Sequence, residues 1–204
     1  MISWEEITAL LVFAFASTWT PGPNNILLTN SGARFGFRRT IPHALGVALG
    51  FPMMIFLVAL GLGELFQTQP WFQQVLRIVG AAVLGWICWR IATLPVPKED
   101  GTGQFQVGKP WRFLQAVAFQ WINPKAWGLA IAVISAHARG DGLIYEALLC
   151  SVPFVISGLT SAHGWTLFGT FIRGFLNTPL RFRVYNLIMG ALVGISGVFL
   201  FFGV

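Results

Sequence analysis

Charged side chains are scarce in this sequence. Only 10% of its 204 residues are charged and 55% are hydrophobic, whereas about a quarter of an average soluble domain is charged. The seven acidic residues fall at or near the ends of long apolar runs, at Glu5, Glu6, Glu64, Glu99, Asp100, Asp141 and Glu146. This shortage of charge excludes an ordinary soluble domain and indicates a chain that resides in a lipid bilayer.

Cysteine and histidine are also rare, which removes several classes of chemistry. Cys88 and Cys150 lie in different apolar runs without a local partner, and an isolated apolar cysteine usually packs as a small hydrophobe. The three histidines have no metal-ligand spacing, and the sequence contains no H-E-x-x-H, C-x-x-C, Ser/His/Asp arrangement or phosphate loop. We therefore predict that the protein is not an enzyme and has neither a metal nor a cofactor.

Apolar stretches long enough to cross a bilayer are abundant, since about 20 residues suffice for one crossing. We identify six such windows, at residues 7–30, 41–62, 73–94, 112–135, 143–170 and 184–203. The longest linker, 95–111, separates three windows from three, so a duplicated unit would insert upside down the second time. The predicted fold is all-α, a single polytopic membrane domain over residues 1–204 with inverted three-helix pseudo-repeats at 1–94 and 112–204.

The net charge of +6 arises mainly from connections that alternate along the chain. Ten of the 13 basic residues follow the first, third and fifth windows: Arg34, Arg38, Arg39, Arg90, Lys98, Lys109, Arg112, Arg173, Arg181 and Arg183. The positive-inside rule places these basic connections in the cytoplasm and both termini outside. This topology explains the charge better than a nucleic-acid partner does. The alternative is a re-entrant first window with the start of the chain inside.

Two polar interruptions occur at corresponding places in the two halves. The first window contains "WTPGPNN" and the fourth contains "WINPKAW". Proline removes a backbone donor and clashes with the preceding turn, so the first helix of each repeat is predicted to break and to leave carbonyls that hydrocarbon cannot satisfy. Paired interruptions of this kind indicate a transporter's binding site. The alternative is a pair of proline kinks that serve only packing, as in a non-transporting membrane scaffold.

The candidate substrate-binding residues lie at these interruptions: Pro21, Gly22, Pro23, Asn24, Asn25, Asn123, Pro124 and Lys125. The asparagine amides need hydrogen-bonding partners, which a polar cavity would supply. A lysine within a span costs about 2.5–3.5 kcal/mol to insert. Lys125 is therefore expected to bind a substrate carboxylate, to act as a proton-linked gate, or to tie structurally to freed carbonyls. His163 in the fifth window is either a packing residue or part of a proton relay.

Several segments together resemble the LysE/RhtB family of bacterial amino-acid exporters over nearly the whole chain. They are "TPGPNN", the following "SGARFGFRRTIPHALGVALGF", "QWINPKAW", "WTLFGTFIRGFL" and "YNLIMGALVGISG". The resemblance implies an inner-membrane carrier that expels amino acids or related metabolites, with proton coupling expected. The motif residues of the family correspond to the eight candidates above.

The second window bears on the substrate. Family members that export lysine or arginine carry an acidic residue in this span, whereas this chain has Gly46 and no carboxylate before Glu64. The resemblance therefore favours neutral amino acids or close derivatives, of the homoserine, threonine or leucine type. Export of another small metabolite on the same scaffold is the alternative. An ion exporter would need intramembrane Asp, Glu or clustered His, and a thiol–disulfide carrier would need a cysteine at each break.

For such a carrier we predict alternating access. The ammonium of a zwitterion would face carbonyls freed at Pro21–Pro23 and the oxygens of Asn24 and Asn25, while its carboxylate would meet Lys125 or a half-helix N-terminus. Lys125 and His163 are the candidates for proton coupling. The predicted partners are the amino-acid substrate and membrane lipid.

Glycines are spaced by four residues at Gly32/Gly36, Gly46/Gly50 and Gly190/Gly194. This small-residue pattern lets helices approach closely, so we predict helix contacts at these positions. A homo-oligomer that uses such a contact is left open.

Overall fold

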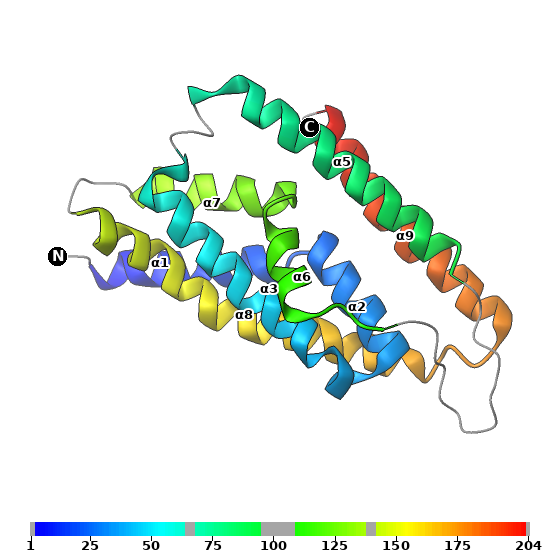
Figure 1. Cartoon of the computed structure of the whole chain (residues 1–204). Helices are drawn as coiled ribbons and strands as arrows, with labels where there is room; N and C mark the ends of the chain where they lie inside the picture. The colour runs from blue at the N-terminus through cyan, green and yellow to red at the C-terminus, as the bar shows by residue number, and fades with distance from the viewer. Residues whose placement is uncertain (1–2, 64–67, 95–108, 138–141, 203–204) are drawn as a thin grey trace.

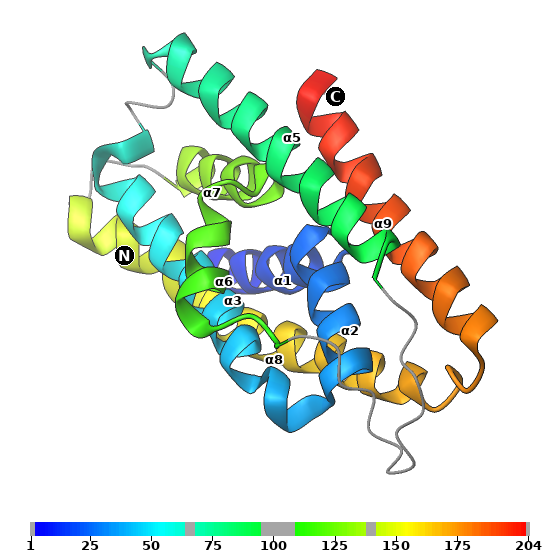
Figure 2. The same ribbon diagram turned by 45° about the vertical axis from the view of Figure 1, so that its right-hand side comes forward.

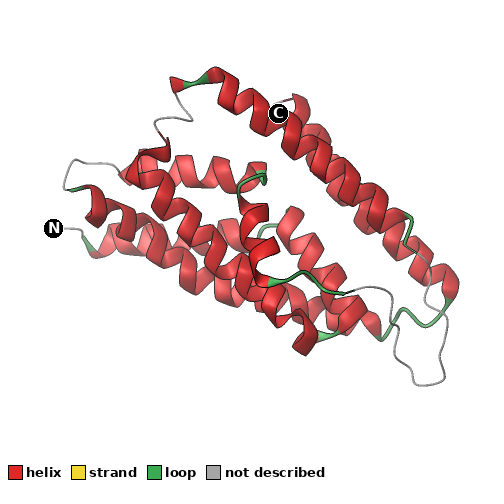
Figure 3. Cartoon of the chain, viewed as in Figure 1, coloured by secondary structure: helices red, strands yellow, loops and turns green. Residues whose placement is uncertain are grey.

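The computed structural model describes residues 3–63, 68–94, 109–137 and 142–202, and within these ranges the chain is helical without strands (Figure 1, Figure 3). The elements are α1 (Trp4–Trp19), α2 (Pro23–Phe35), α3 (Phe37–Leu57), the π-helical turn η1 (Val58–Leu62), α5 (Pro70–Ala92), α6 (Phe113–Gln120), α7 (Pro124–His137), α8 (Leu143–Arg173) and α9 (Pro179–Phe202). Most of the predicted linker, residues 95–108, lies outside the described residues.

Four of the described segments are long and apolar enough to cross a membrane, as judged by length and composition: Phe37–Leu62, Trp71–Ala92, Leu143–Arg173 and Pro179–Phe199. They correspond to the second, third, fifth and sixth predicted windows. Large apolar side chains lie exposed on α5, α8 and α9, among them Trp71, Trp86, Trp89, Leu167, Phe171 and Phe199. Such faces are unfavourable in water and suit a lipid environment.

The two remaining predicted windows are each divided into two helices. α1 ends at Trp19 and α2 begins at Pro23, while α6 ends at Gln120 and α7 begins at Pro124. A proline suits the first helical position because its missing N–H would have no intrahelical partner there. Both predicted interruptions are therefore breaks between separate helices.

The broken segment α1–α2 follows one direction along α8. Phe13 of α1 packs edge-on against Phe154 of α8, with ring centroids 6.2 Å apart. Further along both chains, Gly32 of α2 lies so close to Thr166 of α8 that an added Cβ would collide with the carbonyl oxygen of Thr166. Later residues of the α1–α2 segment thus contact later residues of α8. The segment therefore runs along α8 in one direction and does not turn back on itself as the re-entrant alternative requires.

The helices of the first half of the chain make the same kinds of contacts as those of the second half. α3 packs on α8 and α5 packs on α9, while α1 and α2 pack on α8 as α6 packs on α3. In an inverted repeat, α1–α2 would correspond to α6–α7, α3 to α8 and α5 to α9. Under this exchange the contact of α1 and α2 with α8 becomes the contact of α6 with α3, and the other two contacts stay the same. The pattern supports the inverted repeat, which itself stays a prediction. Figure 2 shows α5 and α9 as an antiparallel pair beside the other helices.

Close helix contacts occur at the spaced glycines. A Cβ at Gly32 or Gly46 would overlap a backbone carbonyl of the neighbouring helix, and one at Gly194 would lie 3.0 Å from the sulfur of Cys88. Gly36 forms the turn between α2 and α3 with a φ of 77°, a left-handed conformation that favours glycine. The predicted packing role is confirmed at Gly32, Gly46 and Gly194, whereas Gly36 serves the turn between two helices.

Candidate functional site

The two helix breaks are joined by a pair of side-chain amides. Nδ2 of Asn24 donates to Oε1 of Gln120 at 2.8 Å, and Nε2 of Gln120 lies 3.3 Å from Oδ1 of Asn24. Gln120 also donates to the carbonyl of Ala116, and its side chain is fully buried. Since α2 begins just before Asn24 and α6 ends at Gln120, this pair holds the first break against the second.

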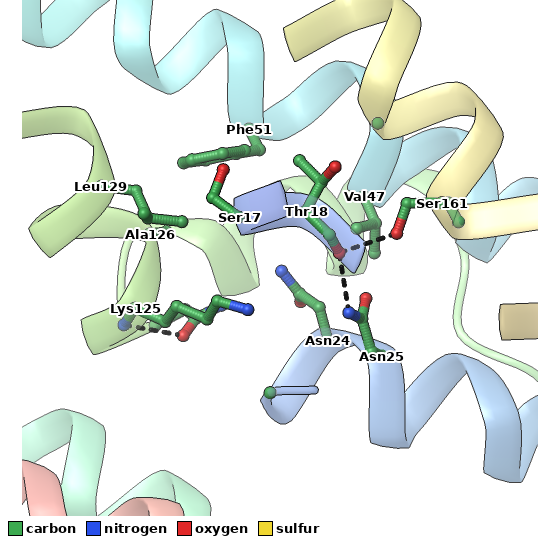
Figure 4. Close-up of a pocket in the computed structure, with 14 residues that line it drawn as sticks. Ser17, Thr18, Asn24, Asn25, Val47, Phe51, Lys125, Ala126, Leu129 and Ser161 are labelled. Carbon is green, nitrogen blue, oxygen red and sulfur yellow. Dashed lines mark hydrogen bonds between the residues drawn. The ribbon is translucent and has the colours of Figure 1, made fainter. Parts of the chain in front are cut away.

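Asn25 donates to two of the carbonyls at the first break. Its Nδ2 donates to the carbonyl oxygens of Thr18 at 2.8 Å and Thr20 at 2.9 Å. The Thr18 oxygen also accepts from Oγ of Ser161 on α8 at 2.7 Å, and the Thr20 oxygen accepts from the ammonium of Lys125. Figure 4 shows Asn25 and Ser161 converging on Thr18. These carbonyls, which we expected to face a substrate ammonium, thus have protein donors.

Asn123 caps the helix that follows the second break. Its Oδ1 accepts from the backbone N–H of Lys125 at 3.2 Å, as expected of an N-cap residue directly before the first helical proline. Its own carbonyl accepts from the N–H groups of Ala126 and Trp127. The side chain is 2% exposed. This cap fixes the start of α7 and thereby positions Lys125 on its first turn.

A small cavity, here called the break cavity, lies where α1, α2, α3, α7 and α8 meet (Figure 4). Its volume is about 50 Å³, room for a few water molecules. Its polar lining includes Thr18, Asn24, Asn25, Asn123, Lys125 and Ser161. Val47 and Phe51 of α3 supply apolar walls.

A larger cavity, the side cavity, lies on the face of the breaks that is turned toward α5 and α9. Its volume is about 570 Å³, and its lining includes Pro21, Gln73, Arg77, Trp121, Trp127 and Phe199. Gly22 and Lys125 line both cavities. The hydrogen bond from Lys125 to Thr20 therefore lies at the border between them.

Gly22 leaves room for the lysine at this border. A Cβ at this position would lie 2.9 Å from Cδ and 3.4 Å from Nζ of Lys125. A larger residue would force the lysine side chain to move. Glycine thus allows the lysine stem to lie against the backbone of the first break.

The structure brings all eight predicted binding residues to these two cavities. Asn24, Asn25 and Asn123 line the break cavity; Pro21, Pro23 and Pro124 line the side cavity; Gly22 and Lys125 line both. His163 is not among the residues that line either cavity. Its Nδ1 lies 2.7 Å from the carbonyl of Leu159, one helical turn earlier, and its ring packs near Phe37.

Sequence reasoning did not single out several residues of the site. Gln120 stands immediately before the second break, so its position was the one available signal. Thr18 contributes a backbone carbonyl, which no sequence pattern reveals. Ser161 and Phe51 reach the site only through the packing of α8 and α3.

The site offers hydrogen-bonding groups and two cations, Lys125 and Arg77, and among the described residues no acidic side chain lines either cavity. Within the described residues there is also no group of three or more His, Cys, Asp or Glu that could hold a metal ion. The arrangement can bind a carboxylate through Lys125 and polar groups of a small ligand through the amides and hydroxyls. Among the described lining residues no carboxylate is present to pair with a cationic side chain of a ligand.

Comparison with known proteins identifies the family of the chain. A family model described as LysE type translocator matches residues 15–203. The chain is 35% identical over 120 residues to the cysteine/O-acetylserine efflux proteins of Escherichia coli strain K12 and Shigella flexneri. The aligned part covers 58% of this chain and 58% of each relative, so the match spans little more than half their length. No solved structure matches the chain.

Proposed function

The chain belongs to the family of LysE type translocators, and we propose that it exports small neutral amino acids or their derivatives across the bacterial inner membrane. The relatives named for cysteine and O-acetylserine favour substrates of that size and charge. Homoserine, threonine and leucine belong to the same neutral class. The observation that carries the proposal is the position of Lys125, whose ammonium lies at the border of two cavities between two broken helices.

The proposed binding step exchanges one partner of Lys125 for another. A substrate carboxylate would replace the carbonyl of Thr20, and because it carries a full charge it is the stronger acceptor. Asn25 already donates to the Thr20 oxygen, so that oxygen keeps a partner when the lysine leaves. The exchange therefore leaves the Thr20 carbonyl with a donor.

The volumes of the two cavities support a substrate that moves between them. The break cavity is small at about 50 Å³, whereas the side cavity has about 570 Å³. We propose that the inverted repeats, with six spans in total, rock around Lys125 so that the smaller space opens as the larger one closes. The basic connections lie in the cytoplasm in this scheme, and proton coupling through Lys125 or His163 stays a prediction.

The charge of the lining supports the neutral class of substrate. A dibasic amino acid would carry an additional cation into a space whose described lining has no carboxylate, and an unpaired charge in such a site is costly. A neutral zwitterion needs only one cationic partner and a few hydrogen-bonding groups. Lys125 and the asparagine amides supply these.

Uptake of labelled amino acids by inside-out vesicles tests the proposal. Neutral amino acids, with cysteine kept reduced, should accumulate above the level in vesicles without the protein, and collapse of the proton gradient should reduce this uptake. Lys125→Met should lose most of the uptake. Arg183→Met is the matched control, because Arg183 is exposed and lines neither cavity. Preferential uptake of arginine, or equal uptake by the two variants, would contradict the proposal.

A further inference from the structure

A third cavity, here called the arginine cavity, lies near the ends of α2 and α5, next to the segment that precedes α6. Its volume is about 210 Å³, and its polar lining consists of Asn30, Ser31, Arg34, His43, Arg90 and Lys109. None of the described residues that line it is acidic. Arg90 and Lys109 are exposed, so the cavity reaches the surface. Both residues belong to the basic connections that the sequence predicts to be cytoplasmic, and we call this side of the protein the basic end.

Three side chains of this cavity are buried without the hydrogen bonds they can make. Arg34 is 6% exposed, His43 is 2% exposed and Asn30 is 8% exposed. Nη2 of Arg34, both ring nitrogens of His43 and Oδ1 of Asn30 have no hydrogen-bond partner in the described structure. A buried polar group without a partner is unfavourable, so these groups are poised for a ligand that supplies one.

Within the described residues, Arg34 also has no carboxylate partner. Its Nη1 lies 3.5 Å from Oδ1 of Asn186, a long and neutral contact. A guanidinium presents a planar set of donors that fits the two oxygens of a carboxylate or phosphate. With Arg90 and Lys109 adding positive charge at the rim, the arginine cavity fits an oxyanion.

One stripe of α2 connects this cavity with the break cavity. Asn24 lines the break cavity, and Leu27, Ser31 and Arg34 line the arginine cavity. Successive members are three or four residues apart, which places them on one side of a helix. At 1.5 Å per residue, the ten residues from Asn24 to Arg34 correspond to about 15 Å along the helix axis.

We propose that the arginine cavity is a second substrate site, where Arg34 binds the carboxylate of the amino acid before the substrate reaches the break cavity. Asn30 and Ser31 would accept hydrogen bonds from its ammonium. The inference rests on the proposed export function and on the cytoplasmic location of the basic end. A lipid phosphate has the same oxyanion chemistry, so the experiment includes it.

The transport arm measures KM for uptake by inside-out vesicles. Arg34→Gln should raise KM about tenfold or more, because it removes charge-assisted hydrogen bonds to the substrate. Arg34→Lys keeps the charge and should give a smaller increase. Arg38→Gln is the control, since it removes the same charge from an exposed position of the neighbouring turn, and it should leave KM unchanged.

The binding arm requires no transport. In protein that lacks Cys88 and Cys150, a Ser31→Cys substitution places a thiol in the wall of the arginine cavity. Acetate should slow its reaction with a small thiol reagent severalfold, whereas acetamide, a neutral molecule of similar shape, should not. Adding Arg34→Gln should abolish the protection, and adding Arg38→Gln should preserve it.

The two arms separate the possible failures. Protection by acetate without uptake by the unmodified protein would reject the export function while supporting an oxyanion site at Arg34. Uptake without protection by acetate would reject the arginine cavity and leave the export function standing. Protection by phosphatidylglycerol in nanodiscs, combined with an unchanged KM of Arg34→Gln, would assign the cavity to lipid and overturn the inference.

Discussion

The amide pair between Asn24 and Gln120 provides a quantitative test of the contact between the two breaks. Asn24→Leu leaves Oε1 of the buried Gln120 without its donor, and Gln120→Leu leaves both polar atoms of the Asn24 amide without the partners they have now. Each single change should lower the free energy of unfolding by about 1–3 kcal/mol, the cost of a buried polar group that loses its partner.

The double variant should lose less than the sum of the two single variants. Hydrogen bonds between membrane helices average about 0.6 kcal/mol and reach about 1–2 kcal/mol. Two bonds join this pair, at 2.8 and 3.3 Å. We therefore expect a coupling energy of about 1–2 kcal/mol in a double-mutant cycle.

Unfolding by sodium dodecyl sulfate in mixed micelles, followed by circular dichroism, measures these free energies. Gln115→Leu is the matched control for Gln120→Leu, because Gln115 is an exposed glutamine of the same helix and its side chain contacts the N–H of Arg112. Its effect should add to that of Asn24→Leu within about 0.5 kcal/mol. Additive behaviour of Asn24→Leu and Gln120→Leu would refute a direct link between the breaks.

Two further predictions concern stability in the same assay. Gly169→Ala should destabilise the protein by at least 1 kcal/mol, roughly the lower end of the cost of overpacking, because its Cβ would overlap the carbonyl oxygen of Thr29. Gly128→Ala, where an added Cβ meets nothing within 4 Å, should be neutral or stabilising; equal losses at both glycines would be evidence against tight packing of α2 on α8. Asn123→Ala should cost about 1 kcal/mol by removing the cap to the N–H of Lys125, while Asn123→Ser should restore most of it. An equal loss in both variants would argue against capping.

The helix breaks could be predicted from the sequence because their cause is local. Proline cannot donate a backbone hydrogen bond, and the consequence appears within a few residues of Pro23 and Pro124. The long apolar windows were equally accessible, since crossing a bilayer fixes a minimum length. These local rules located both breaks and the eight predicted residues, which are among those that line the two cavities.

The partners of those residues depend on the tertiary fold and could not be predicted in the same way. Adjacent Asn24 and Asn25 look equivalent in the sequence. In the structure Asn24 pairs with Gln120, whereas Asn25 donates to backbone carbonyls of its own break. Which role each takes depends on the direction of its side chain on α2 and on the place of α6.

The burial of Arg34 also depends on the tertiary fold and could not be predicted from the sequence. Its place among several arginines indicated only a charged connection between spans. In the structure α2 extends to Phe35, and packing buries Arg34 within the last turn of that helix. Whether a charged residue at the end of a span faces water or protein is decided by neighbouring helices, so composition alone does not reveal it.

The most direct test of a substrate site at the helix breaks is equilibrium binding to purified protein, measured with the amino acid that the vesicles take up best. Lys125→Met should weaken binding about tenfold or more, as expected for the loss of a charge-assisted contact, while Arg183→Met should bind like the unmodified protein. Equal affinity of the two variants would contradict a role for Lys125 in holding the substrate.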